Sequence, residues 1–190
     1  MKTLATALAL ALVSPAAAFD EADALFGKLK ALCGQAFAGR VVSTDERDKD
    51  MASQNLVMHM RSCDAARIAI PFHVGDDRSR TWRITRTDTG LRLKHDHRHE
   101  DGTPDTVTMY GGDSLPPGTA SRQDFPADAE TKALFSANKL DASLTNVWSI
   151  EVQPGKIFVY ELNRENRHLR VEFDLTKPIP APPPAWGDKD

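Results

Sequence analysis

From about residue 39 to residue 112, apolar and polar side chains alternate in short runs, the pattern of β-strands that bury one face. The segments between the runs carry Asp and Gly, which favour tight turns. Such short connections make neighbouring strands antiparallel, so the pattern predicts a meander. The expected strands are residues 40–44, 56–62, 67–74, 81–87, 91–99 and 106–111.

The flanking segments predict two helices and three more strands. Residues 20–33 place apolar side chains every three or four positions, which is typical of an amphipathic helix. Residues 113–143 form a long connection, and helix-forming residues occupy 127–139 within it. The proline-rich segment 177–184 is expected to be extended and to lie outside the sheet ladder. The additional strands are expected at residues 145–152, 156–162 and 168–175.

About nine antiparallel strands, one N-terminal helix and one helix in the long connection predict a single, mainly β domain. We expect a closed or nearly closed meander barrel, because closure removes the exposed edges of a long sheet. A two-sheet β-sandwich is the alternative. The architecture resembles the calycin-type barrels, which include the lipocalin-like bacterial ligand-binding barrels, over most of the chain. The lipocalin Gly-x-Trp signature is absent near the first strand and Trp82 comes later, so the resemblance implies no particular ligand or binding residue.

The N-terminus has the three parts of a secretory signal peptide. Lys2 supplies a positive start, residues 4–13 are almost entirely apolar, and small residues lead up to Ala18. The apolar run is too short to span a bilayer, which takes about 20 residues. We therefore expect cleavage after Ala18 and a periplasmic or secreted protein. The predicted organisation is a signal peptide over 1–18, a barrel domain over 19–176 and a proline-rich tail over 177–190.

Charge and cysteine content narrow the choice of partners and compartment. The net charge is −3, and it becomes −4 when Lys2 is removed with the signal peptide. Basic residues are scattered among acidic ones, which argues against a nucleic acid or an anionic membrane surface as a partner. No later segment predicts a transmembrane helix. The chain has two cysteines, Cys33 and Cys63, which we expect to form a disulfide in an oxidising compartment; a pair of buried free thiols is the alternative.

A histidine-rich strand carries the strongest candidate chemistry. With a period of two, the apolar start at Leu91 and Leu93 places His95, His97 and His99 on the inward face of the barrel. The opposite face is expected to contact water, because its members are all charged: Arg92, Lys94, Asp96, Arg98 and Glu100. His73 and His168 are likewise expected on the solvent side of their strands.

The inward histidines are compatible with three kinds of site. They can form a polar barrel mouth, line a pocket for an organic ligand, or hold a metal ion or haem, with zinc and copper as the expected metals. His95 and His99 are about 13 Å apart along a strand, so a metal would need an adjacent pair and a donor from another strand. We name four candidate binding residues: His95, His97, His99 and His59. Other conceivable donors are His73, Met58, Met60, Asp96 and Glu161, and the candidate pocket-lining aromatics are Trp82, Trp148, Phe158 and Tyr160.

These observations favour an exported β-barrel that binds a small molecule or a metal. One alternative is a small lyase or isomerase that uses a histidine such as His97 as a general base with an acid such as Glu161 nearby. Another is an envelope protein with a filled barrel that acts through its surface. The sequence has no Gly-x-Ser-x-Gly, His-Glu-x-x-His or Cys-x-x-Cys motif, so no catalytic residue is assigned.

Overall fold

The computed structural model describes residues 15–116 and 118–188. The predicted signal peptide therefore lies mostly outside the described residues, and only its last positions, from Pro15, are included as helical backbone. The described helices are α1 (Pro15–Lys30), α2 (Lys49–Ala52) and α3 (Ala129–Ala137), with short 3-10 turns η1 (Glu46–Asp48) and η2 (Asp141–Ser143). None of the helices among the described residues is both long and apolar enough to cross a membrane.

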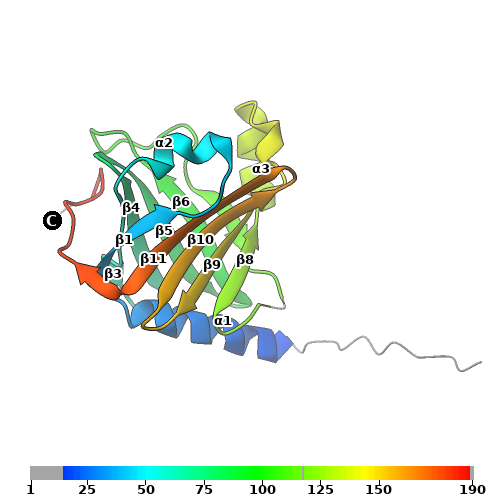
Figure 1. Ribbon diagram of the computed structural model, residues 1–190. Helices are drawn as coiled ribbons and strands as arrows, with labels where there is room; N and C mark the ends of the chain where they lie inside the picture. The colour runs from blue at the N-terminus through cyan, green and yellow to red at the C-terminus, as the bar shows by residue number, and fades with distance from the viewer. Residues whose placement is uncertain (1–14, 117, 189–190) are drawn as a thin grey trace, which may run out of the picture.

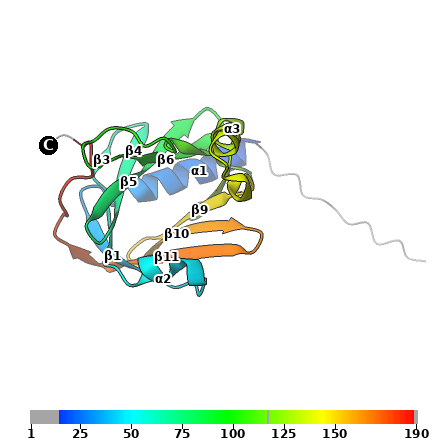
Figure 2. The same ribbon diagram turned by 90° about the horizontal axis from the view of Figure 1, so that it is seen from above.

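The strands form one antiparallel sheet that curls into a nearly closed barrel (Figures 1 and 2). Their order is β7-β6-β5-β4-β2-β1-β11-β10-β9-β8, with β3 paired to β4. This confirms the predicted mainly β, antiparallel barrel, although the described residues contain eleven strands and not about nine. The strands are β1 (Ala36–Val41), β2 (Leu56–His59), β3 (Ser62–Cys63), β4 (Arg67–Val74), β5 (Asp77–Thr87), β6 (Gly90–His97), β7 (Tyr110–Asp113), β8 (Arg122–Pro126), β9 (Val147–Gln153), β10 (Ile157–Arg164) and β11 (Arg167–Ile179).

Two of the differences from the predicted strands have clear causes. β8 lies in a segment expected to be loop, because its inward-facing positions are Gln123 and Phe125 and the buried glutamine hides the alternation. The expectation that the proline-rich segment stays outside the ladder is wrong at its start. β11 continues to Ile179, and Pro178 lies opposite Phe37 beyond an irregularity in the register. A proline is tolerated at such a strand end next to a bulge.

Helix α1 closes one end of the barrel (Figure 1). Its apolar side chains Leu25, Phe26 and Leu29 are fully buried in the core. The guanidinium of Arg86 lies 4.4 Å from the centre of the Phe26 ring, and it also pairs with Asp23. A disulfide joins Cys33, just after α1, to Cys63 on β3, which confirms the predicted bridge. The N-terminal helix is therefore fixed to the barrel by packing, charge and a covalent bond.

Above α1 the barrel is filled as far as a layer of stacked aromatic rings. Trp82 lies between Phe72, at a centroid distance of 4.8 Å, and Tyr160, at 4.4 Å. The Phe158 and Phe173 rings pack in a T-shaped, edge-to-face arrangement, with their centroids 5.7 Å apart. The strand register places this layer one step above the aliphatic core, because Trp82 is opposite His95 while the next inward pair is Ile84 and Leu93. Helices α2 and α3 lie at the other end of the barrel (Figure 1).

The outer face of the sheet is less exposed than the alternation suggested. Asp96 and Lys94 were expected in water but are only 2% and 8% exposed. Asp96 pairs with Arg83 at 2.7 Å and with Arg98 at 2.8 Å, and Lys94 pairs with Asp128, the N-cap of α3, at 2.8 Å. Strand periodicity assigns a side chain to a face, but it does not show that charged neighbours and a helix end cover that face.

His73 was also expected in water and is 4% exposed. Its Nε2 is buried without a hydrogen-bond partner among the described residues. Burial lowers the pKa of His73 to about 4. Part of the outer face is covered by the C-terminal segment, which returns along β5: the Trp186 amide donates to the Arg78 carbonyl at 3.0 Å, and the Arg78 guanidinium donates to the Pro184 carbonyl at 2.9 Å.

Candidate functional site

The barrel is hollow at the end opposite α1, where a cavity of about 360 Å³ opens between α2, α3 and the β10–β11 hairpin. We call it the mouth cavity. Among its most deeply buried side chains are Trp82, Trp148 and His95, each 2% exposed. The apolar and aromatic part of the lining is completed by Met51, Phe72, Val107, Tyr110, Phe135, Leu140, Tyr160, Leu162 and Leu169. The polar part consists of Arg80, His95, His97, Ser143, Asn146, Arg164 and Arg167.

His95 is held in one orientation and one protonation state. Its Nδ1 lies 3.1 Å from the Tyr110 carbonyl, which can only accept, so Nδ1 carries the proton. Its Nε2 then accepts a hydrogen bond from the Tyr160 hydroxyl at 2.8 Å. Burial lowers the pKa of His95 to about 3, so the imidazole is neutral at any ordinary pH. Both ring nitrogens are thus occupied within the protein.

His97 lies one step closer to the opening. Its Nε2 shares a hydrogen bond with the Tyr110 hydroxyl at 3.0 Å, and its backbone amide donates to the Thr108 hydroxyl at 2.7 Å. Burial is the main cause of the lowered pKa of His97; Arg80 adds to it, and Asp105 opposes it. Within the described part of the chain, no hydrogen bond engages Nδ1 of His97. This imidazole is therefore neutral with one nitrogen open to another partner.

Tyr110 links the two histidines. Its ring stacks on His95 at a centroid distance of 4.7 Å, its carbonyl accepts from His95, and its hydroxyl bonds His97. Burial raises the pKa of Tyr110 to about 12, so the phenol keeps its proton. The residues on both sides of Tyr110 have positive φ angles, which are uncommon for residues with side chains: Met109 has a φ of 54° and Gly111 a φ of 152°. A methyl group on Gly111 would lie 1.9 Å from the Leu93 carbonyl oxygen, so only glycine allows β7 to approach β6 this closely.

The arginines of the mouth cavity differ in their partners. Arg167 pairs with Asp48 and Asp45, and Arg80 pairs with Asp77 at 2.7 Å. Arg164 instead donates to two neutral oxygens, the Ser143 hydroxyl at 3.0 Å and the Asn146 side-chain carbonyl at 2.9 Å. The lining as described contains no Asp or Glu. The cavity therefore combines aromatic walls with an excess of positive charge.

The fold brings some of the candidate residues named from the sequence together in the mouth cavity, and it places the others elsewhere. His95, His97, Trp82, Trp148 and Tyr160 all line the mouth cavity. His99 lies beyond the end of β6 and is exposed, and His59 is 7% exposed but does not line the cavity. Phe158 is fully buried in the aromatic layer beneath the cavity. Among the described residues, no group of three or more His, Cys, Asp or Glu side chains is placed to hold a metal ion.

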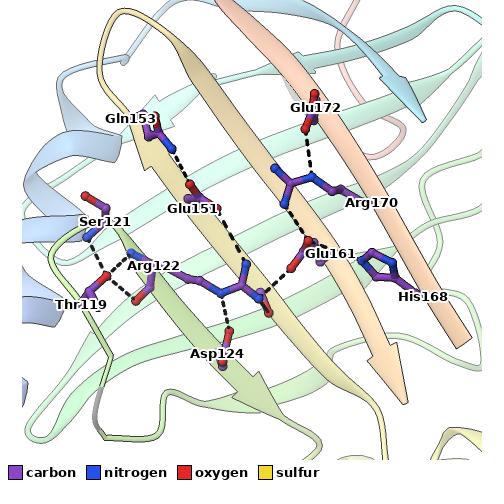
Figure 3. A network of polar contacts seen from close by, with 11 residues as sticks. Thr119, Ser121, Arg122, Asp124, Glu151, Gln153, Glu161, His168, Arg170 and Glu172 are labelled. Carbon is purple, nitrogen blue, oxygen red and sulfur yellow. Dashed lines mark hydrogen bonds and ion pairs between the residues drawn. The ribbon is translucent and has the colours of Figure 1, made fainter. Parts of the chain in front are cut away.

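Glu161, which the sequence offered as a metal donor or as an acid partner for a histidine, lies on the outer face of the barrel (Figure 3). It is held between Arg122 and Arg170, at 2.7 Å from each, with His168 at 3.5 Å. These charge-assisted contacts lower its pKa, against the effect of burial. Glu161 is a structural anion that ties β8, β10 and β11 together, and it does not reach the mouth cavity.

Tyr110, Arg80, Arg164 and Arg167 are the site residues that the sequence reasoning did not identify. The strand predicted over residues 156–162 stops short of Arg164, which continues the inward series Phe158, Tyr160 and Leu162 with a period of two. That continuation is the signal that could have identified Arg164. Tyr110 lies near the end of the strand predicted over residues 106–111, and the alternation there assigns it no role in a site. Comparison with known proteins gives no match: no family model, curated protein or solved structure is significantly similar to this chain. The fold and the site together define a half-filled antiparallel barrel with an aromatic, cationic mouth.

Proposed function

We propose that this chain is an exported binding protein that holds a small organic molecule in the mouth cavity. The observation that carries the proposal is the hollow upper half of the barrel, a cavity of about 360 Å³ in a molecule whose lower half is tightly packed. Small-molecule sites have volumes of roughly 300–1,000 Å³, mainly apolar walls and a few fixed polar groups. The aromatic walls and the neutral histidines and tyrosines supply these features.

The hydrogen-bonding pattern favours an organic ligand over a metal ion. Both nitrogens of His95 are already engaged, so this imidazole has no lone pair free for a metal. Its role is to fix Tyr160 and Tyr110 in place. His97 and the hydroxyl oxygens of the two tyrosines then offer hydrogen bonds at defined positions in an apolar cavity, which is the arrangement that orients a small ligand.

Native mass spectrometry tests the proposal directly. The untagged protein, secreted by a bacterial host, is expected to carry a small-molecule adduct that is released on denaturation and identified from the extract. Leu162→Trp, which places an indole in the mouth cavity, should remove the adduct, whereas Leu115→Trp, at a side chain that is 57% exposed, should keep it. Elemental analysis of the same sample reports any metal. An adduct-free protein that also fails to bind an apolar fluorescent dye would overturn the proposal.

The same spectrum tests export. The disulfide supports an oxidising compartment, because thiols in the cytosol are normally kept reduced. The intact mass should correspond to a chain that starts at Phe19, with Cys33 and Cys63 oxidised. A mass that includes residues 1–18 in protein recovered outside the cytosol would contradict the predicted cleavage.

A further inference from the structure

The charge in the mouth cavity is not balanced at the corner formed by η1, α2 and the β10–β11 hairpin. Three guanidinium groups, those of Arg47, Arg164 and Arg167, meet two carboxylates there, those of Asp45 and Asp48. Three positive charges against two negative ones leave a net charge of +1.

The unbalanced charge belongs to Arg164. Arg167 is bidentate to Asp48 and also pairs with Asp45, and Arg47 is held by Asp45. Arg164 uses a single nitrogen, Nη1, for its two bonds to Ser143 and Asn146, and its Nε and Nη2 make no bond to the described residues. Loss of water and the nearby Arg167 and Arg47 lower its pKa, and Asp45 opposes this only in part. Among the described residues, no carboxylate forms an ion pair with Arg164. A guanidinium with its fork free is suited to a carboxylate, which it binds with two parallel hydrogen bonds.

We infer that the mouth cavity selects a monocarboxylate with an apolar or aromatic body, its head group bound by Arg164 and its body lying against Trp148 and Tyr160. The inference rests on the proposed function and names its ligand class. A dianionic head such as a phosphate monoester would need a second unpaired cation, and Arg80 and Arg167 already have carboxylate partners. The volume limits the size: about 360 Å³ is the space of roughly a dozen water molecules at ~30 Å³ each.

A matched set of probes tests the head group. 4-Phenylbutyrate, 4-phenylbutanamide and 3-phenylpropyl phosphate have similar size, and they differ in the charge at one end. Isothermal titration and quenching of tryptophan fluorescence report binding, since Trp82 and Trp148 line the cavity. The carboxylate is expected to bind about tenfold more tightly than the amide, the difference that one charge-assisted pair provides. Equal affinity for acid and amide, or tighter binding of the phosphate, would overturn the inference.

Two substitutions test the role of Arg164. Arg164→Gln should weaken 4-phenylbutyrate about tenfold and leave the amide unchanged. Asn146→Asp keeps the arginine and places a carboxylate at a side chain that it already contacts, so it should have the same effect without removing the guanidinium. Arg40→Gln, at a side chain that is 78% exposed, is the control. If Arg164→Gln and Asn146→Asp weaken acid and amide equally, the head group does not lie at Arg164.

The outcomes also separate this inference from the proposed function. If none of the three probes binds but the purified protein carries a neutral or cationic adduct that Leu162→Trp removes, the mouth cavity is a binding site and the carboxylate selectivity is wrong. If neither the probes nor an adduct occupies the cavity, both fail. Unfolding curves for each variant show whether the barrel is intact before binding is compared.

Discussion

Four histidines in this small barrel are buried enough to have lowered pKa values: His59, His73, His95 and His97. Burial disfavours the imidazolium form, and in the described part of the chain no carboxylate forms an ion pair with any of the four. Two of these side chains have surroundings other than those expected: His73 was expected in water and is buried, and His59, a candidate binding residue, does not line the mouth cavity. The alternation in the sequence indicated which face of its strand each histidine occupies. Whether that face is buried depends on neighbours that are distant in the chain.

The buried neutral His95 predicts a specific loss of stability in mild acid. An imidazole in the unfolded chain takes up a proton near pH 6.5, whereas His95 in the fold does so only near pH 3. Between these values the unfolded state binds more protons, so the free energy of unfolding falls as the pH falls, by up to about 1.4 kcal/mol per pH unit. This contribution is fully present above pH 6.5 and is reduced by about 3 kcal/mol at pH 4.

Urea unfolding from pH 7.5 to pH 4 measures this effect. His95→Gln is expected to flatten the dependence of the unfolding free energy on pH, whatever its effect on stability at pH 7.5. His99→Gln is the matched control, because it makes the same change at an exposed side chain a short distance along the chain. The same pH slope for His95→Gln and His99→Gln would show that His95 is not held neutral by the fold.

At the scale of elements, the critical feature is the seam between β7 and β8, where the sheet meets itself. The Asp128 amide donates to the Gly111 carbonyl at 3.0 Å, and the buried Thr131 hydroxyl bonds both the amide and the carbonyl of Gly111, at 2.7 and 2.8 Å. A methyl group on Gly112 would lie 1.9 Å from the Pro126 carbonyl oxygen. The start of α3 and two glycines therefore close the barrel where a regular strand pair is missing.

Gly111→Ala should destabilise the barrel next to this seam, where β7 pairs closely with β6. Its positive φ and the contact with Leu93 each cost of the order of 1–3 kcal/mol for a residue with a side chain, so we expect a loss of about 3 kcal/mol or more. Gly27→Ala is the control, since a methyl group there meets nothing within 4 Å and a helical alanine should add about 0.5–1 kcal/mol. Thermal unfolding of the two variants checks the difference. An unaffected midpoint for Gly111→Ala would contradict the close approach of β7 and β6.

The elements that the sequence predicted well are those with regular alternation. β4 occupies residues 67–74, as expected, and β10 and β11 begin within one residue of their predicted starts. β8 was missed because Gln123 faces inward. β1 was placed four residues too late, because Ala36 and Phe37 precede Gly39, where the alternating pattern was taken to begin. Gly39 is in fact inside the strand, where Phe173 occupies the space of its missing side chain. A glycine can mark either a turn or close packing, and only the partner strand distinguishes them.

At the scale of the whole molecule, the two ends of the barrel have different properties. α1 fills one end with fully buried side chains, while the other end has the mouth cavity. Alternation predicted which side chains face inward. It could not show that the interior is filled only to the level of the Trp82 layer, because filling depends on how rings from four strands stack across the barrel. The volume of the cavity is a property of the assembled molecule.

The disulfide stabilises the filled end. Cys33 and Cys63 are separated by 30 residues, and closing a loop of this length stabilises the fold by about 3–4 kcal/mol in the chain-entropy model. The double variant Cys33→Ala, Cys63→Ala should lose roughly this amount in urea unfolding. It should keep the relative affinities for the 4-phenylbutyrate and 4-phenylbutanamide probes, because neither cysteine lines the mouth cavity. Adding a reductant to the double variant should have no further effect, whereas it should lower the stability of the wild type.

The pairing of β1 with β11 also determines how late in synthesis the barrel can complete its folding. Ala36 lies opposite Ile179. One edge of β1, the strand that follows the first helix, therefore lacks its hydrogen-bonding partner until β11, the last strand, has been made. Because synthesis proceeds from the N-terminus, the growing chain exposes an unpaired sheet edge, which favours aggregation, until β11 is available. Truncation before β11 (Arg167–Ile179) would therefore leave β1 without this partner and give an aggregation-prone chain.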